Sequence, residues 1–541
     1  MTDRARLAGS VTLTALIALG LPGLVAAQSG YVTEVAVPGS PFKGLHGLAF
    51  DSEDVLHGAS ITGMSLYRIN TQTGAVVTIV GPPLGVADDL AFGPDGVIAW
   101  TARDAIHVRD SDGSIRVIAE DVDGANSINF GPDGRLFFTR IFRADELYEG
   151  FLDGRRPRLI VDGLKGLNGF EVTDNGKIIG PQFFGNAIVS VNIETGAIET
   201  LADGIQTPAA VNLLSNGDVI ALGYRTGKVF RIDAKTHAVN EIAQLQGTPI
   251  DNLAIDSNDR VFISHSSYNG ITELDPDTGE TRRVIWGELS APAGLTVIQQ
   301  EGHELILSAD AWSHRTVDPA TGDVTVLAVG PGVFGSAAIA ADTDRIVITN
   351  TTPSGMMQIL DRATGTNIDS LFGFGAPYGV LVEKGGNILV ADYGTDSLIR
   401  IEKGEGRPRT VIANDLGGPI GIVSDGADGV YVTGHTDGTV SWVDLNSGAR
   451  NIITAGLARP EGIARLPSGT LAVAEVGTRR LVLVDPDNGT VTGIASDLPI
   501  GFDLGGAGSP PAIVTGVAVT RDGSIYVTGD VNNSLIKVHS N

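Results

Sequence analysis

The chain has 541 residues, a formal net charge of −26 at pH 7 and no cysteine. The lack of cysteine excludes disulfides, thiolate metal sites and haem attachment through cysteine. The negative charge is spread along the chain, and it disfavours nucleic acid and anionic membranes as partners.

The first 27 residues have the pattern of a secretory signal peptide. Arg4 and Arg6 precede an apolar run over 13–24, and small residues follow as far as Ala27. A basic start, a short apolar stretch and a small-residue cleavage site are the three parts of such a signal. We predict cleavage after Ala27 and a periplasmic or secreted protein with no membrane anchor thereafter. An uncleaved anchor helix is the alternative, although the run is short for a membrane span.

Beyond the signal, one sequence motif recurs twelve times at intervals of about 42 residues. An apolar alternation, a polar turn with Gly or Asp and a second apolar run make up each copy, as in DDLAFGPDGVI (88–98) and TGVAVTRDGSIY (515–526). A period of this length, with short strands and turns inside it, is typical of a β-propeller with one four-stranded blade per repeat. The fold class is therefore predicted to be all-β.

Twelve blades exceed what a single ring normally holds, so the sequence predicts two tandem six-bladed propellers. We place the first propeller at 28–278 and the second at 279–541, with the strand predicted over 281–286 closing the second ring. In the alternative, the strand predicted over 31–36 pairs with the last repeat, and the boundary then falls near Leu289. Either arrangement hides an edge strand.

The start of each inner strand should line the mouth of the central channel. Counting along the repeats, these positions are His46, Asp88, Asn126, Asn168, Ala209 and Asp251 in the first ring, and Ala293, Ser336, Tyr378, Ile420, Glu461 and Thr515 in the second. Five of the six positions in the first ring are polar. Polar side chains that converge on one axis can hold a cation or polarise a substrate, so any active site is expected in the first ring.

The blade motif resembles the six-bladed group that contains NHL-repeat propellers, the gluconolactonase (senescence marker protein) family and strictosidine-synthase-like proteins. Asn168-Gly169 is similar to that family's Asn-Gly at its metal, Asn126 to its substrate-side Asn, and Asp251 to its Asp. The chain departs from the family where His46 replaces a Glu and where Ala209 stands in the blade that carries the family's Asp. The resemblance implies one divalent ion (Ca, Zn or Mn) on His46, Asn168 and Asp251, and metal-assisted hydrolysis of a lactone or ester. Asp251 or Asp88 would be the base.

The loops after the second strands add further candidates. Arg140, Tyr224 and Arg225 are predicted to bind the substrate, and the arginines would suit a carboxylate on it. His265 is a possible catalytic base. Alternatively, each arginine pairs with an acid on the blade surface, and the histidine is a hydrogen-bonded rim residue.

The second ring carries weaker signals. Glu461 and Glu475 share one blade, and with His435 they could hold a cation. The interval before Thr515 is about twelve residues longer than the period, and the extra segment, over 501–511, is predicted to be a functional loop at the mouth.

These observations predict an exported, metal-dependent hydrolase of the gluconolactonase-like type, acting on a small lactone or ester at the mouth of the first propeller. Two alternatives stay open. One is a pair of propellers that binds a ligand or a protein without catalysis, since the fold hosts both classes. The other is a lyase of the streptogramin-lyase type.

Overall fold

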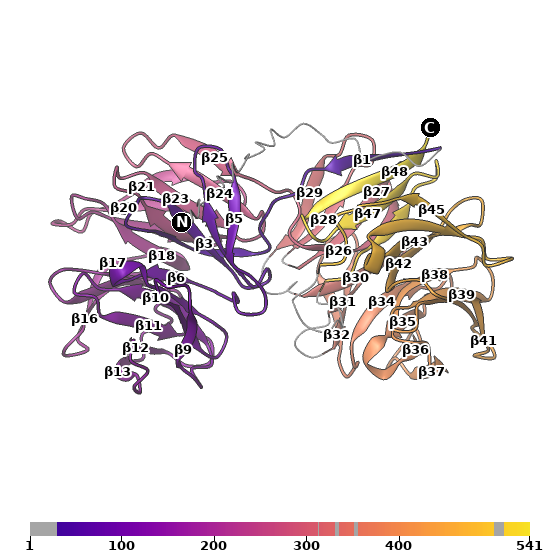
Figure 1. The fold of residues 1–541 in the computed structure, drawn as a ribbon, viewed down its shortest axis with the longest axis horizontal. Helices are drawn as coiled ribbons and strands as arrows, with labels where there is room; N and C mark the ends of the chain where they lie inside the picture. Colours follow the sequence, from indigo (N-terminus) through magenta and orange to yellow (C-terminus); the bar gives the residue numbers. More distant parts are fainter. Residues whose placement is uncertain (1–29, 312, 330–334, 351–354, 503–512) are drawn as a thin grey trace, which may run out of the picture.

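The computed structural model describes residues 30–311, 313–329, 335–350, 355–502 and 513–541. The predicted signal peptide and most of the 501–511 segment lie outside these residues. Within them, the chain forms twelve four-stranded antiparallel sheets and three short 3-10 turns, at Pro94–Gly96, Tyr393–Thr395 and Val476–Thr478. The sheets build two six-bladed propellers that lie side by side (Figure 1), and the predicted fold class is confirmed.

The first propeller takes its strands in chain order. They are β2 (Leu45–Phe50), β3 (Leu56–Ser60), β4 (Ser65–Ile69), β5 (Val76–Val80); β6 (Leu90–Phe92), β7 (Ile98–Thr101), β8 (Ile106–Arg109), β9 (Ile115–Ala119); β10 (Ala125–Phe130), β11 (Leu136–Arg140), β12 (Glu146–Gly150), β13 (Arg158–Asp162); β14 (Glu171–Val172), β15 (Lys177–Gln182), β16 (Ala187–Asn192), β17 (Ile198–Asp203); β18 (Pro208–Leu213), β19 (Val219–Gly223), β20 (Lys228–Ile232), β21 (Val239–Gln244); and β22 (Ile250–Ile255), β23 (Val261–His265), β24 (Gly270–Leu274), β25 (Thr281–Ile285).

The second propeller takes its strands from the C-terminal half of the chain and from the N-terminus. They are β26 (Pro292–Gln300), β27 (His303–Asp310), β28 (Ser313–Val317), β29 (Val324–Val329); β30 (Ser336–Ala341), β31 (Arg345–Asn350), β32 (Met356–Asp361), β33 (Asn367–Leu371); β34 (Pro377–Val382), β35 (Ile388–Asp392), β36 (Ser397–Ile401), β37 (Arg409–Asn414); β38 (Pro419–Ser424), β39 (Gly429–Gly434), β40 (Thr439–Asp444), β41 (Arg450–Thr454); β42 (Pro460–Arg465), β43 (Leu471–Glu475), β44 (Arg480–Val484), β45 (Val491–Ala495); and β46 (Val517–Val519), β47 (Ile525–Gly529), β48 (Ser534–Ser540) with β1 (Tyr31–Val37).

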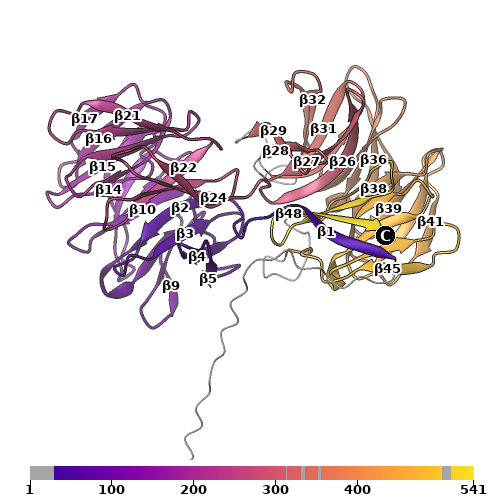
Figure 2. The same cartoon turned by 90° about the horizontal axis from the view of Figure 1, so that it is seen from above.

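The closure of the second ring corrects the predicted domain boundary. β1 pairs antiparallel with β48, whereas β25 pairs with β24 and completes the sixth blade. The division at 278/279 is therefore wrong, and the alternative near Leu289 is correct. Without β1, β48 would present an open edge, and the N-terminal strand covers it. From β1 in the second propeller the chain passes into the first propeller and then returns to the second, as the position of β1 beside β48 in Figures 1 and 2 shows.

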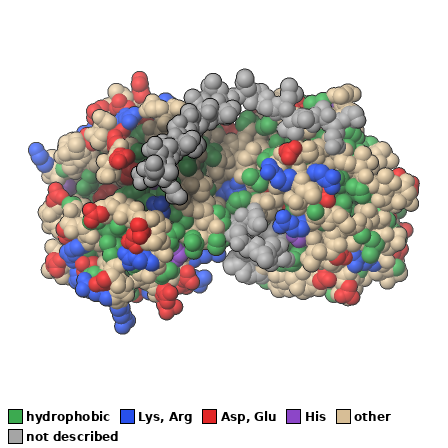
Figure 3. Space-filling view, in the orientation of Figure 1, with side chains coloured by type: hydrophobic (Ala, Val, Ile, Leu, Met, Phe, Trp, Pro, Cys, Tyr) green, Lys and Arg blue, Asp and Glu red, His purple; other side chains and the backbone are tan. Residues whose placement is uncertain are grey.

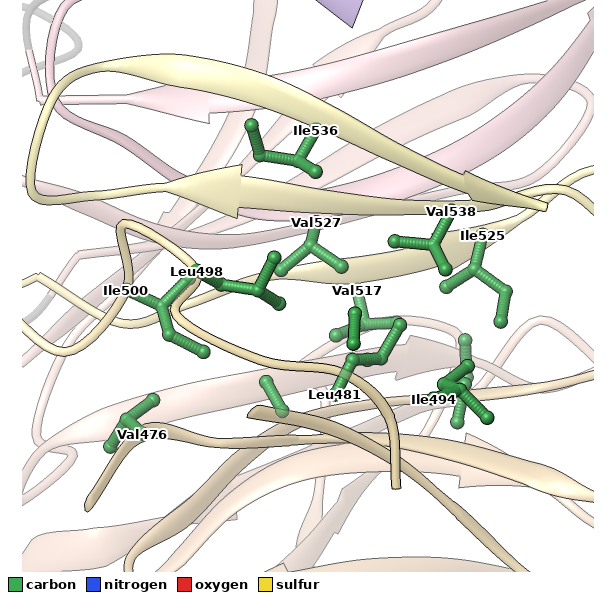
Figure 4. Close-up of a cluster of buried hydrophobic side chains, with 14 residues drawn as sticks. Val476, Leu481, Ile494, Leu498, Ile500, Val517, Ile525, Val527, Ile536 and Val538 are labelled. Carbon is green, nitrogen blue, oxygen red and sulfur yellow. The ribbon is translucent and has the colours of Figure 1, made fainter. Parts of the chain in front are cut away.

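The core lies between blades rather than within one. Val476, Leu481 and Ile494 of the eleventh blade pack against Val527 and Ile536 of the twelfth in one buried cluster (Figure 4). Since a blade in mid-ring is covered on both faces, second strands such as β43 (LAVAE) and β47 (IYVTG) are buried along their whole length. Outer strands such as β5 (VVTIV) are partly exposed. This explains why the second strand of each blade appears in the sequence as a nearly continuous apolar run.

Two local devices fix the channel mouth. A hydroxyl on the second strand of one blade donates to the mouth residue of the next, as Thr101 Oγ1 does to the Asn126 carbonyl and Ser264 Oγ to the His46 carbonyl, both at 2.6 Å. A glycine after the mouth residue lets neighbouring blades approach closely. A Cβ on Gly47 would lie 2.5 Å from Asp89 Oδ1 and 2.7 Å from Asp89 Cα. The mouth side chains therefore stand on a rigid backbone.

A buried polar junction joins the two propellers. Lys43, which precedes β2, donates from Nζ to the Val531 carbonyl at 2.5 Å and lies 4.5 Å from the centre of the Phe502 ring. Asn533 of the second propeller donates from Nδ2 to the Ser40 carbonyl at 2.7 Å. These contacts fix the first propeller against the strands into which it is inserted.

The surface carries its charge in a dispersed form. On the face seen in Figure 3, acidic and basic side chains are interspersed over both propellers. In the part of the chain that the structure describes, no helix has the length and apolar character that a membrane span requires.

Candidate functional site

A cavity of about 460 Å³ opens at the mouth of the first propeller. Its lining includes five predicted mouth residues, His46, Asp88, Asn126, Asn168 and Asp251. Ala209, the sixth mouth residue and an apolar one, is not part of the lining. The fold therefore brings together residues up to 205 positions apart in the sequence (46 to 251), as the spacing of the repeats predicts.

His46 lies between two carboxylates. Its Nδ1 is 2.6 Å from Asp251 Oδ2 and 3.5 Å from Asp88 Oδ1. All three side chains are largely buried, with exposed side-chain fractions of 11% for His46, 16% for Asp251 and 20% for Asp88. Because the first and last blades of the ring are neighbours, β2 and β22 place His46 beside Asp251, and the segment before β6 adds Asp88 from the other side.

Hydrogen bonds extend this group around the mouth. Asn126 Nδ2 donates to Asp88 Oδ2. Ser127 Oγ lies 3.2 Å from Asn126 Oδ1 and 2.9 Å from Asn168 Oδ1, so one hydroxyl links two blades. The result is a continuous polar network from Asp251 to Asn168, which orients each side chain before any ligand binds.

The carboxylates control the charge of the imidazole. Burial by itself lowers the pKa of His46, but the charge and hydrogen bond of Asp251, with the charges of Asp88 and Asp89, raise it above its usual value. Burial raises the pKa of Asp88 to about 6, against the opposing effects of His46 and Asn126. Burial also raises the pKa of Asp89, which accepts hydrogen bonds from the Ile128 backbone and from Asn252. The carboxylates thus favour the charged form of the imidazole, while a pKa of about 6 leaves Asp88 largely ionised at neutral pH.

The opposite side of the cavity is aromatic. Phe142, Phe183, Phe184 and Tyr224 follow the second strands of the third, fourth and fifth blades, and all four line the cavity with Arg225. The Phe183 ring centre lies 5.2 Å from that of Phe184 and 5.4 Å from that of Tyr224. The structure therefore places Tyr224 and Arg225 at the cavity, where the sequence predicts them.

Arg140 and His265 lie outside the cavity lining. Arg140 bonds Glu146 and the Asp123 carbonyl, both at 2.9 Å, so the alternative of pairing with a surface acid holds for it. The two ring nitrogens of His265 face the Gly247 carbonyl at 2.8 Å and Thr272 Oγ1 at 2.9 Å. Burial lowers the pKa of His265 to about 4, and this neutral, enclosed ring is not placed to act as the predicted base.

The predicted metal ligands are engaged in hydrogen bonds within the protein. A contact of 2.6 Å between His46 Nδ1 and Asp251 Oδ2 is a hydrogen bond, and a nitrogen that carries this proton cannot bind an ion. Asn168 Oδ1 accepts from Ser127 and from the Gly169 backbone. Among the described residues, no three His, Asp or Glu side chains are placed to hold a metal. This arrangement does not fit a metal ion bound to His46 Nδ1. The divalent ion expected on His46, Asn168 and Asp251 therefore stays a prediction.

The second mouth is organised differently. His435 Nδ1 lies 3.6 Å from Glu461 Oε1, but Glu475 binds Arg480 and the Ala458 backbone, so the three predicted cation ligands do not meet. Burial, with the charge of Asp530, raises the pKa of Glu461 to about 8. This mouth is filled largely by apolar residues that include Tyr378 and Ile420.

No protein-family model and no curated protein sequence matches the chain. Among solved structures, the chain is similar to a gluconolactonase from Xanthomonas campestris (14% identity, 46% of this chain and 93% of that one, TM-score 0.36). It is also similar to a streptogramin B lyase (14% identity, 70% and 94%, TM-score 0.26) and to the extracellular domain of a one-component system from B. thetaiotaomicron (11% identity, 94% and 74%, TM-score 0.33). The chain is a β-propeller protein. At these identities the likeness concerns the fold alone.

Several lining residues are not among those that sequence reasoning selects. Asp89, Ser127 and Asn252 each follow a mouth position directly, so a search of both residues at each strand start would have found them. Phe142 lies two residues after Arg140, and Phe183 and Phe184 follow Gln182. Exposed aromatic residues at the same loop in successive blades are a signal that the sequence does contain.

Proposed function

We propose that the first propeller is a hydrolase, with a small lactone or ester as its substrate and the mouth cavity as its active site. The observation that carries this proposal is His46, held between Asp251 and Asp88 on the wall of a cavity large enough for a small molecule. An imidazole with one carboxylate as an orienting partner and a second as a proton acceptor is a recurring arrangement in acid–base catalysis.

Each group has a distinct role in the proposed reaction. Asp88, with a pKa of about 6, supplies a carboxylate at neutral pH and takes a proton from the attacking water. The water oxygen bonds to the carbonyl carbon, and the acyl–oxygen bond then breaks. His46 gives a proton to the leaving alkoxide, and the resting state returns when Asp88 releases its proton to solvent and His46 takes one up from solvent. Asp251 is a positioning residue that holds the ring and favours its charged form.

The remaining lining residues would bind rather than react. Asn126 fixes Asp88, and Asn168 is tied to Asn126 through Ser127. Arg225 would hold an anionic group of the substrate, and Tyr224 would pack against its apolar part.

The test is hydrolysis of a panel of p-nitrophenyl esters and of lactones, measured by product absorbance and by proton release. We expect His46→Gln and Asp251→Asn to lower kcat/KM by roughly 100- to 10,000-fold, while exposed His303→Gln in the second propeller leaves it unchanged. If the wild-type protein hydrolyses no ester or lactone, the hydrolase proposal is wrong, and the alternative of a propeller pair that binds a ligand without catalysis is favoured. Full activity in His46→Gln would contradict the assigned roles.

Metal content is measured on the same preparations. About one Ca, Zn or Mn ion per chain, lost in Asn168→Ala and Asp251→Ala, would support the ion that the resemblance implies and would contradict direct His46–Asp251 bonding. We also propose that residues 1–27 direct export. The mass of the mature protein, which should begin at Gln28, tests this.

A further inference from the structure

The aromatic residues at the cavity are confined to one side of the ring. Blades three, four and five supply Phe142, Phe183, Phe184 and Tyr224, whereas blades six, one and two supply Asp251, His46 and Asp88. The cavity therefore has a charged half, which contains the proposed acid–base groups, and an aromatic half.

Two of the four rings in the aromatic half are largely exposed to solvent, and Phe183 and Tyr224 are partly exposed. Phe142 is 68% exposed and Phe184 is 59% exposed, although both contact neighbouring rings, with Phe142 5.7 Å from Phe184. Rings that only fill a core are buried, because exposing a large apolar group to water forfeits the stabilisation that its burial would give. Adjacent exposed rings at the rim of a cavity mark a surface that a ligand covers.

A cation lies beside the aromatic half. Arg225 follows Tyr224 directly, is exposed, and lines the cavity. Within the residues that the structure describes, its guanidinium has no ion pair or hydrogen bond. Most of the cavity's other polar groups are bonded to one another, so Arg225 is the group available to an incoming anion.

We propose that the ligand of this cavity is a small molecule with an aromatic ring and an anionic group, the ring packed on Phe183 and Phe184 and the anion on Arg225. This deepens the proposed function, on which it rests, because it makes the substrate an aromatic ester or lactone rather than a polyhydroxylated one. Such a ligand fits the volume of the cavity, its ring matches the aromatic half, and its anion matches the charge of Arg225.

The test is binding of 2-naphthoate by calorimetry, with neutral 2-naphthol and saturated cyclohexanecarboxylate as comparison ligands. We expect Phe183→Ala and Phe184→Ala each to weaken 2-naphthoate binding by roughly 3- to 10-fold. Arg225→Gln should weaken it by about 10-fold and leave 2-naphthol binding unchanged. Phe372→Ala, a similarly exposed phenylalanine (57%) in the second propeller, and Arg103→Gln, in the corresponding loop of the second blade, are the matched controls.

The outcomes separate this inference from the proposed function. Equal affinity for cyclohexanecarboxylate, or wild-type affinity in both phenylalanine variants, would overturn the ligand class even if the protein hydrolyses simple aliphatic esters. If 2-naphthoate binds as expected but naphthyl esters and other esters are not hydrolysed, the ligand class stands and the hydrolase fails. Unchanged thermal midpoints of the variants show that their folds are intact.

Discussion

Glu171 tests whether the channel of the first propeller destabilises an ionised carboxylate. It lines a polar cavity of about 200 Å³, and Asp89 and Asn252 line both this cavity and the proposed active site. Burial raises the pKa of Glu171 to about 7, despite opposing hydrogen bonds from Asn129 and the Val172 backbone. Glu171→Gln removes the charge and keeps the shape of the side chain.

The magnitude and sign follow from proton linkage. A rise from 4.5 to about 7 corresponds to roughly 3 kcal/mol, and to roughly 2–3 kcal/mol with solvent screening of a partly exposed carboxyl. Below pH 4.5 the acid is protonated in both the folded and the unfolded chain, so it brings no penalty. As the pH rises to 7, the unfolded chain releases the proton that the folded chain retains, and the wild type loses this stability. Above pH 7 the loss is complete and constant.

The assay is the thermal midpoint of wild type and Glu171→Gln between pH 4 and pH 8. For a cooperative unit the size of this propeller, 1 kcal/mol moves Tm by about 2–4 °C, so the variant should gain on the order of 4–12 °C over the wild type across this range. Exposed Glu280→Gln, in the same propeller, should show no such trend. A Tm difference that is the same at pH 4 and at pH 8 would refute a buried acid at Glu171.

Three other predictions concern the framework. Gly47→Ala should lower the free energy of unfolding by about 1–3 kcal/mol, because the new Cβ would clash with Asp89. Gly385→Ala is the control, since no atom lies within 4 Å of its Cβ position. Equal losses of stability in the two variants would contradict this account. Lys43→Met should cost roughly 3 kcal/mol in urea unfolding, because it removes the cation beside buried Asp530, and exposed Lys235→Met should cost nothing. A chain that starts at residue 38 lacks β1 and exposes β48, so protease should cleave the second propeller first and leave 38–289 protected; equal cleavage of both propellers would show that β1 does not close the ring.

The sequence by itself determined the repeat, the number of blades and the polar mouth of the first ring. A blade is a local unit of consecutive strands, so apolar alternation and turn residues specify it without distant contacts. Once the blades form a ring, the position of His46, Asp88 or Asp251 within its repeat already sets its place at the mouth.

Only the tertiary structure decided how the rings close and how the mouth side chains pair. The strand over 281–286 and the strand over 31–36 have similar patterns, and the choice between them depends on which free edge, that of β24 or that of β48, each can reach. Likewise, the sequence places His46, Asn168 and Asp251 at one mouth but does not show that His46 donates directly to Asp251. The aromatic half of the cavity also depends on ring geometry, because loops about 42 residues apart become neighbours only when the ring closes.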